Sequence, residues 1–362
     1  MWKGMLAFLF SKGKIMNTLF LRVAKLSIGF IFLAIVSNSA MAQSFYQSKT
    51  IVFIVGTAPG GGFDTYTRII ARHFGKKVPG NPTIIVNNMP GAGTLIAANY
   101  MYKSAKPDGL TIGLFSGSMI IKDVLGEKGV EFDGRKFRWL GTPAPERHVC
   151  VLTEKSGIKT LDDWLAAKVP MRFGSLGPGN ATSGVPEVLK AILGLPIKVV
   201  EGYKGTSDIR IAAEAGELEG ACWGWDSIKV TWAKGLETGF IRPLIQATLE
   251  AHPDLPLVPV AINHAKTKEA RDLLRFTAQA YGPSAIAFSV PPGMPKERLL
   301  TLQSAFMDTM KDLEFLAETA KAKLVINPID GPTITKIVSE LYAGEPGLIA
   351  RFREITEGAP RH

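Results

Sequence analysis

Three consecutive glycines, Gly60 to Gly62, stand between an apolar run at Ile51–Val55 and a segment whose apolar residues have helical spacing. Consecutive glycines let the backbone approach a ligand without interference from Cβ atoms, and the start of a helix offers unpaired N–H groups to an anion. The stretch Asn87–Ala98 repeats the arrangement after the next apolar run. Phosphate, a dinucleotide and a carboxylate are the candidate anions, although a tight turn without a ligand explains either loop alone equally well.

Motifs for nucleotide binding and for hydrolysis are missing from the sequence. It contains neither the Gly-Lys-Ser/Thr of a P-loop nor, from Gly60 onward, the third glycine of a dinucleotide fingerprint. It also lacks a G-x-S-x-G elbow and an H-E-x-x-H pair, and we expect His148, His252 and His264 to lie at the surface. We therefore expect no catalysis, no cofactor and no metal site. A carboxylate-sized anion is the remaining ligand.

The first 42 residues have the order of a secretory signal. A basic start is followed by an apolar core at Leu26–Val36 and by a small-x-small cleavage site at Ala40–Ala42. The core is shorter than the roughly 20 apolar residues that span a bilayer. We expect translation to start at Met16, cleavage to leave Gln43 as the mature N-terminus, and a periplasmic location. A signal anchor is the alternative.

Charge and length restrict the class of the exported chain. Removal of the signal takes away five Lys and Arg residues and no acidic residue, which lowers the formal net charge from +10 to +5. No basic run in the remaining 320 residues exceeds Lys76-Lys77, so nucleic-acid binding is disfavoured. A chain of this length is large for one core and suits two lobes. We expect a monomer.

Strand-like and helix-like patterns alternate along the mature chain, and both glycine loops fit this order. The strand-like runs are Ile51–Val55, Thr83–Val86, Thr111–Phe115, Val149–Thr153, Met171–Phe173, Ile197–Val200, Ala221–Trp225, Ile241–Gln246 and Ser284–Ser289. Such alternation predicts an α/β fold with mostly parallel sheets flanked by helices. Asp64 is the N-cap candidate of the first helix. Loops at the carboxyl ends of parallel strands are where open α/β sheets bind ligands.

The only two cysteines, Cys150 and Cys222, each lie in a strand-like run. Export permits a disulfide between them, and two buried free thiols are the alternative. Neither has a His or a second Cys at metal-ligand spacing, so a metal site is not expected there.

Seven stretches of the chain follow one another in a recognisable order. They are APGGGFD (58–64), NNMPGAGT (87–94), KPDGLTIGL (106–114), the Gly/Ser loop GSLGPGNATSG (174–184), YKGTSD (203–208), AGELEGACWGWDS (215–227) and PPGMPKERL (291–299). With them, nearly the whole mature chain resembles the Bug-type solute-binding receptors of tripartite tricarboxylate transporters. The resemblance implies a two-lobed, type II-like periplasmic binding protein with the ligand in the cleft between the lobes. It implies lobe I at 43–146 plus 277–362 and lobe II at 147–276.

Carried over position by position, the resemblance also implies a set of ligand-binding residues. They are Pro59, Gly60, Gly61, Gly62 and Asp64 in the first loop, Gly91, Ala92 and Gly93 in the second, Ser116, Gly117 and Ser118 after the third strand, and Asn180, Ala181, Thr182, Tyr203, Lys204, Gly205 and Asp226 in lobe II. Trp223 and Trp225 are candidates for the cleft wall, and strand alternation lets only one of them face the ligand.

The implied function is non-enzymatic capture of a small carboxylate and its delivery to membrane permease subunits. The arginine that the family usually carries is replaced by Met89, and no histidine follows Asn180 where the family has one. The ligand is therefore open between a di- or tricarboxylate and an apolar or aromatic carboxylate. A ligand-dependent periplasmic sensor on the same scaffold is the alternative function, followed by an exported hydrolase.

Overall fold

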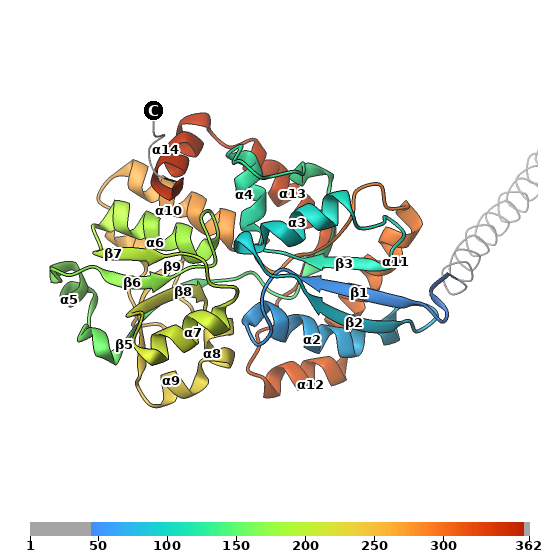
Figure 1. Ribbon diagram of the computed structural model, residues 1–362, viewed down its shortest axis with the longest axis horizontal. Helices are drawn as coiled ribbons and strands as arrows, with labels where there is room; N and C mark the ends of the chain where they lie inside the picture. Colours follow the sequence, from blue (N-terminus) through green and yellow to red (C-terminus); the bar gives the residue numbers. More distant parts are fainter. Residues whose placement is uncertain (1–44, 358–362) are drawn as a thin grey trace, which may run out of the picture.

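The computed structural model describes residues 45–357, which form two α/β lobes joined by several crossovers (Figure 1). Lobe I is built on a six-stranded sheet and lobe II on a five-stranded sheet. This is the two-lobed architecture that the sequence predicts. The predicted signal peptide, 1–42, lies outside the described residues. Across the described part of the chain, no helix combines the length and the apolar character that crossing a membrane requires.

The sheet of lobe I has the strand order β11-β4-β10-β3-β1-β2. Its strands are β1 (Thr50–Val55), β2 (Thr83–Asn88), β3 (Thr111–Leu114), β4 (Arg138–Thr142), β10 (Phe288–Val290) and β11 (Ile329–Asp330). β1 pairs in parallel with β2 and β3, as the alternating pattern predicts. β10 runs antiparallel to β3 and β4, so the sheet is mixed. The sequence pattern missed β4, and it placed the start of β10 too early, at Ser284.

Helices cover both faces of this sheet (Figure 1). They are α2 (Gly62–Phe74), α3 (Leu95–Lys103), α4 (Ser118–Val124), α11 (Lys296–Thr309), α12 (Leu313–Lys321) and α13 (Gly331–Tyr342), with short 3-10 turns η1 (Gly75–Lys77), η2 (Ala92–Thr94) and η3 (Gly134–Lys136). The apolar face of α2 buries Tyr66, Ile70 and Phe74 against β2, α11 and α12. Residues at this three- and four-residue spacing share one side of a helix, which is why the first glycine loop is anchored to the core on its helical side.

The sheet of lobe II has the order β7-β6-β8-β5-β9. Its strands are β5 (His148–Thr153), β6 (Met171–Gly174), β7 (Ile197–Val200), β8 (Gly220–Gly224) and β9 (Ile241–Ala247); its helices are α5 (Leu161–Ala166), α6 (Ala181–Leu193), α7 (Thr206–Ala215), α8 (Trp225–Thr231), α9 (Ala233–Glu237) and α10 (Lys268–Tyr281), with turns η4 (Glu154–Ser156) and η5 (Ala261–His264). β6 is parallel to β7 and β8, whereas β5 is antiparallel to β8 and β9.

A disulfide joins the two cysteines inside lobe II. Cys150 on β5 lies directly opposite Cys222 on β8, and both residues are fully buried. Of the two alternatives left open by the sequence, the disulfide is the one observed.

The last helix, α14 (Pro346–Glu357), packs against α6 and α10 of lobe II, although α13 before it belongs to the helices of lobe I (Figure 1). The Phe352 ring lies 5.0 Å from the Phe276 ring and 5.9 Å from the Tyr281 ring, and Phe352 is fully buried. The C-terminal segment therefore crosses from one lobe to the other. The exact lobe boundaries stay a prediction.

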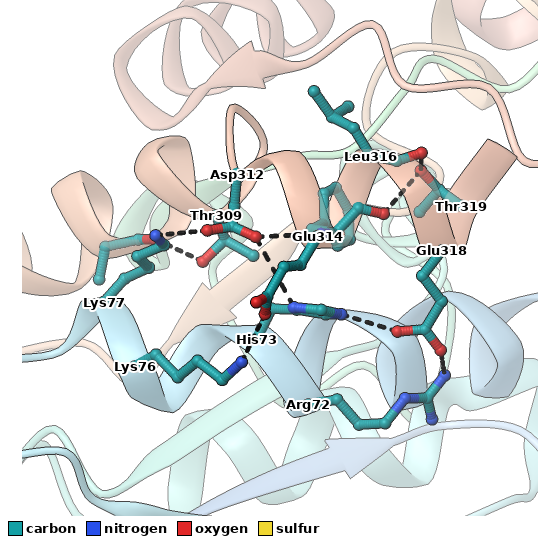
Figure 2. A network of polar contacts seen from close by, with 12 residues as sticks. Arg72, His73, Lys76, Lys77, Thr309, Asp312, Glu314, Leu316, Glu318 and Thr319 are labelled. Carbon is teal, nitrogen blue, oxygen red and sulfur yellow. Dashed lines mark hydrogen bonds and ion pairs between the residues drawn. The ribbon is translucent and has the colours of Figure 1, made fainter.

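A polar network fixes the end of α2 to α12 on the outside of lobe I (Figure 2). Arg72 and His73 both contact Glu318, with 2.7 Å between His73 Nε2 and Glu318 Oε2. The ammonium groups of Lys76 and Lys77 lie 2.7 Å from Glu314 and 2.6 Å from Asp312. The network holds the helix whose first turn carries the glycine loop.

Candidate functional site

The pocket of interest lies between the two lobes. Its lining residues are Thr57, Gly62, Phe63, Ser116, Glu146, His148, Leu176, Asn180, Ala181, Thr182, Thr206, Trp223 and Ser227. They come from the β1–α2 loop, the end of β3, the crossover before β5, and the β6–α6, β7–α7 and β8–α8 segments. Five of the residues implied by the sequence resemblance are among them: Gly62, Ser116, Asn180, Ala181 and Thr182. Lys and Arg are absent from the described lining.

The starts of three helices meet at this pocket. Gly62 and Phe63 are the first residues of α2, Ala181 and Thr182 are the first residues of α6, and Thr206 begins α7. The first N–H groups of a helix have no partner within it, and they carry the positive end of the helix dipole. Thr182 N already donates to Asn180 Oδ1 at 3.0 Å. The other helix-start N–H groups are the backbone donors that an anion in the pocket could meet from both lobes without a cationic side chain.

The first glycine loop is organised by the buried carboxylate of Asp64. Its oxygens accept hydrogen bonds from Gly60 N (2.9 Å), Arg68 Nε (2.9 Å) and Asn88 Nδ2 (3.0 Å). Burial by itself would raise the pKa of Asp64, but these hydrogen bonds outweigh it and hold the pKa below its ordinary value. The expectation that Asp64 is the N-cap was wrong, because the cap position belongs to Gly61 and Asp64 lies in the first turn. Asp64 therefore fixes the conformation of the glycine loop without lining the pocket.

The second glycine loop has an unusual backbone. Gly91, Ala92, Gly93 and Thr94 all have positive φ, at 141°, 47°, 64° and 85°. Ala and Thr rarely adopt such angles, so the surrounding structure must stabilise this conformation. Thr94 contributes by accepting a hydrogen bond from Ser116 N at 3.0 Å, which connects the loop to the end of β3.

Hydrogen bonds across the cleft join both loops of lobe I to lobe II. Ala58 N donates to Lys204 O at 3.0 Å, and Ser207 Oγ donates to the carbonyl oxygen of Pro59 at 3.2 Å. At the second loop, Asn180 Nδ2 donates to Gly93 O at 3.2 Å. The lobes are thus in a closed arrangement. Lys204 takes part through its backbone, while its side chain is exposed.

The remaining implied residues lie around the pocket without lining it. They are Pro59, Gly60, Gly61, Asp64, Gly91, Ala92, Gly93, Gly117, Ser118, Tyr203, Lys204, Gly205 and Asp226. Ser118 Oγ lies 2.6 Å from Ser116 Oγ, so it supports a lining residue. Asp226 lines a neighbouring hollow and pairs with Lys229 at 2.8 Å. Direct ligand contact by any of these residues stays a prediction.

Eight lining residues were not among those implied as ligand contacts, and five of them carry a polar group that is buried or nearly so: Thr57, Glu146, His148, Trp223 and Ser227. Glu146 and His148 come from the crossover into lobe II, with 3.3 Å between Glu146 Oε2 and His148 Nε2. Neither His148 Nε2, Trp223 Nε1 nor Ser227 Oγ has a hydrogen-bond partner. Unpartnered buried polar atoms are rare and costly in folded proteins, so their concentration at one pocket indicates a place for a ligand or for water.

Burial shifts both titratable groups of this wall toward their neutral forms. It raises the pKa of Glu146 to about 8, with a further increase from the negative charge of Asp226, and it lowers the pKa of His148 to about 4. The expectation of solvated histidines was wrong for His148 and for His252, which are each 3% exposed. One feature of the sequence could have indicated this wall: a charged group stands directly before an apolar strand in the lobe crossover, between Pro143 and His148.

The two tryptophans lie in different surroundings because β8 ends at Gly224 and Trp225 begins α8. The expectation based on strand alternation was wrong, since residues two apart in one strand face the same side. Trp223 lines the pocket and stacks on Trp232, with 5.7 Å between ring centroids. Trp225 instead packs in the core of lobe II, and its Nε1 donates to Asp254 at 3.2 Å.

Within residues 45–357, metal-ligating atoms come together at His73, Asp312 and Glu314, within 4.8 Å of one another. Both carboxylates are already paired with lysines (Figure 2). His73 lies at the opposite end of α2 from Gly62, roughly 16 Å along the helix at 1.5 Å per residue. The cluster is part of the α2–α12 contact and separate from the pocket.

Comparison with known proteins gives the following relationships. A family model described as "Tripartite tricarboxylate transporter family receptor" matches residues 67–342. The chain is 26% identical over 235 residues to a UPF0065 protein of Pseudomonas sp. (strain P51), which covers 63% of this chain and 68% of the relative. It is 26% identical over 223 residues to a UPF0065 protein of Agrobacterium vitis, covering 60% of this chain and 63% of the relative.

Solved structures share the fold at low sequence identity. The periplasmic binding protein BugD has a TM-score of 0.70 at 17% identity, covering 86% of this chain and 98% of that chain. A Rhodopseudomonas palustris protein with adipate has a TM-score of 0.67 at 19% identity, covering 86% and 97%. MatC from the same organism, with bound malate, has a TM-score of 0.66 at 18% identity, covering 85% and 99%.

Proposed function

The chain belongs to the receptor family of tripartite tricarboxylate transporters, and from that premise we propose that it captures a small carboxylate between its lobes and delivers it to membrane permease subunits. On this proposal the protein acts in the periplasm after removal of residues 1–42, works as a monomer, and performs no catalysis. The solved relatives bound to malate and adipate support a carboxylate ligand.

The single observation that carries the proposal is the meeting of three helix starts at one pocket whose described lining has no Lys or Arg. A carboxylate is small enough to accept hydrogen bonds from several helix N-termini at once, and each dipole favours its negative charge. Phosphate would meet the same donors, but its second charge would lack the arginine or lysine partner that phosphate sites commonly use.

The cross-lobe hydrogen bonds support capture by closure. Ala58, Pro59 and Gly93 of lobe I are held by Lys204, Ser207 and Asn180 of lobe II, so a ligand between the loops is enclosed when these bonds form. Hinge closure of this kind couples binding to a change in shape, which a permease can recognise.

A thermal-shift screen against mono-, di- and tricarboxylates tests the proposal. A ligand at 100 times its dissociation constant adds about 2.7 kcal/mol to the unfolding free energy, which shifts the melting temperature of a protein this size by a few degrees. Small-angle scattering with a hit should show the radius of gyration at or below that of the free protein. Absence of any stabilising carboxylate would contradict the proposal.

A further inference from the structure

The wall formed by Glu146, His148 and Trp223 differs from the rest of the pocket. The helix starts offer N–H donors, whereas Glu146 offers a carboxyl group that is itself shielded from water. Its one polar side-chain contact among the described residues is His148 Nε2 at 3.3 Å. The pocket thus has a donor-rich part and a part that carries an acid.

Within residues 45–357, no Lys or Arg side chain forms an ion pair with this acid. Arg147 lines the neighbouring hollow together with Glu146, but the two side chains are not paired. Lys229 Nζ lies 2.8 Å from Asp226 and 2.6 Å from Asp254, so it already pairs with two carboxylates. Asp226 itself shares the hollow with Glu146, and its negative charge acts on the Glu146 carboxyl. Burial keeps His148 neutral. Glu146 therefore lies among groups that favour an additional positive charge or hydrogen-bond donor beside it.

This environment discriminates between ligands by their second functional group. A second carboxylate near Glu146 would keep Glu146 protonated, and its own charge would find no cation partner there and would be poorly solvated. An ammonium group would instead favour the ionised form of Glu146, and the resulting charge-assisted bond is about twice as strong as a neutral one. An amide N–H would donate to a carboxyl oxygen that has no cation partner.

We propose that Glu146 and His148 form a specificity subsite for a nitrogen group that donates hydrogen bonds, so that the ligand is a monocarboxylate with an amino or carboxamide group at its far end. The inference rests on the proposed function, because it assumes that the helix starts bind the carboxylate of the ligand. The cavity between the closed lobes measures only about 30 Å³, so it favours a short ligand, and the lobes must separate to admit one.

Calorimetric titration with four length-matched compounds tests this inference: glutarate, glutaramate, 4-aminobutyrate and butyrate. These share the carboxylate and differ only in the far-end group. For the wild-type protein we expect 4-aminobutyrate or glutaramate to bind at least tenfold tighter than glutarate. In Glu146→Gln we expect that ratio to fall at least tenfold, while butyrate binding stays within threefold. Gln has nearly the same shape, and Glu146 is largely uncharged at pH 7, so the variant should fold.

Glu201→Gln is the matched control, because Glu201 is exposed and contacts Ser183 at 2.7 Å outside the pocket lining. It should leave all four affinities unchanged. Glutarate binding as tightly as both nitrogen compounds in the wild type would overturn the subsite, as would an unchanged ratio in Glu146→Gln. If none of the four compounds binds and the wider carboxylate screen is also negative, the proposed function fails and the subsite fails with it.

Discussion

Substitution of Gly62 by alanine should block closure of the lobes without weakening either of them. A Cβ atom at this position would lie 2.1 Å from Ser227 Oγ and 2.6 Å from Ser227 Cβ, closer than real Cβ atoms approach any neighbour. Gly62 begins α2 of lobe I and Ser227 lies in α8 of lobe II, so the overlap exists only when the lobes are together. Alanine is also a better helix residue than glycine, which favours α2 itself.

The size of the effect follows from the overlap. Forcing one extra carbon into a packed contact typically costs about 1–3 kcal/mol. If that free energy is taken from the closed state alone, the dissociation constant of a ligand that requires closure rises roughly 5- to 150-fold. The unfolding free energy of the free protein should stay the same or rise slightly, because the open lobes avoid the contact.

Two further variants separate this explanation from general damage. Ser227→Gly removes both overlapping atoms and leaves Ser227 Cα at 3.6 Å, an ordinary contact, so the double variant Gly62→Ala/Ser227→Gly should bind better than Gly62→Ala alone. Gly61→Ala is the matched control in the same loop: its φ is −87°, and its Cβ would meet the rotatable Thr206 hydroxyl at 2.8 Å. It should cost less than Gly62→Ala.

The assay is calorimetric titration of the four proteins with the best carboxylate from the thermal-shift screen, with circular dichroism and melting curves for each. Affinity of Gly62→Ala within twofold of the wild type would refute the reasoning. So would a double variant that binds no better than Gly62→Ala.

The other predictions concern protons, the disulfide, Lys204 and the N-terminus. Glu146 keeps its proton up to about pH 8 in the folded state and loses it near pH 4.5 in the unfolded state, whereas His148 binds a proton below pH 6.5 in the unfolded state and only below about pH 4 in the folded state. Between pH 6.5 and 8 only Glu146 contributes, so the unfolding free energy measured by urea titration should fall by up to about 2 kcal/mol as the pH rises. Glu146→Gln should make the unfolding free energy nearly independent of pH in this window. Reduction of Cys150–Cys222, which spans 72 residues, should lower the unfolding free energy by up to about 4 kcal/mol at 25 °C, and a loss below 1 kcal/mol would contradict the chain-entropy argument. Lys204→Ala should change ligand affinity by no more than about threefold, because the cross-lobe hydrogen bond uses the backbone oxygen of Lys204. Complete loss of ligand binding in this variant would instead show that the Lys204 side chain belongs to the site. Mass spectrometry of periplasmic protein should find Gln43 as the first residue; a chain retained in the membrane with Met16 intact would show a signal anchor instead.

Much of the framework was predictable because it depends on local patterns. β1, β2 and β3 follow from runs of β-branched residues, and their parallel order follows from the helices between them. β4 was missed because Arg138–Thr142 is short and contains a charged residue and a glycine.

The glycine loops were recognised, but the reason for the glycines was only partly foreseen. Gly91 and Gly93 require positive φ, as turn residues often do. Gly61 and Gly62 lie against Thr206 and Ser227 of the other lobe, more than 140 residues away in sequence. Contacts at such separation leave no periodic signal, so the sequence could not distinguish approach to a ligand from approach of a lobe.

Glu146 and His148 escaped prediction for a related reason. An acid and a histidine at the end of a Pro-rich stretch are typical of a solvated turn, and only the packing of α2, β8 and the crossover encloses them. Burial of a polar side chain is a tertiary property, which helical or strand periodicity does not report.

The placement of α14 has a consequence for biogenesis. Strands and helices of lobe II are complete at Tyr281, yet α14 packs on α6 and α10 as well. A chain that emerges from an export channel N-terminus first would therefore leave Phe276 and Tyr281 without their contact to Phe352 until α14 has passed. Vectorial translocation would delay completion of lobe II, which leaves an interval in which a holding chaperone can bind the exposed apolar surface.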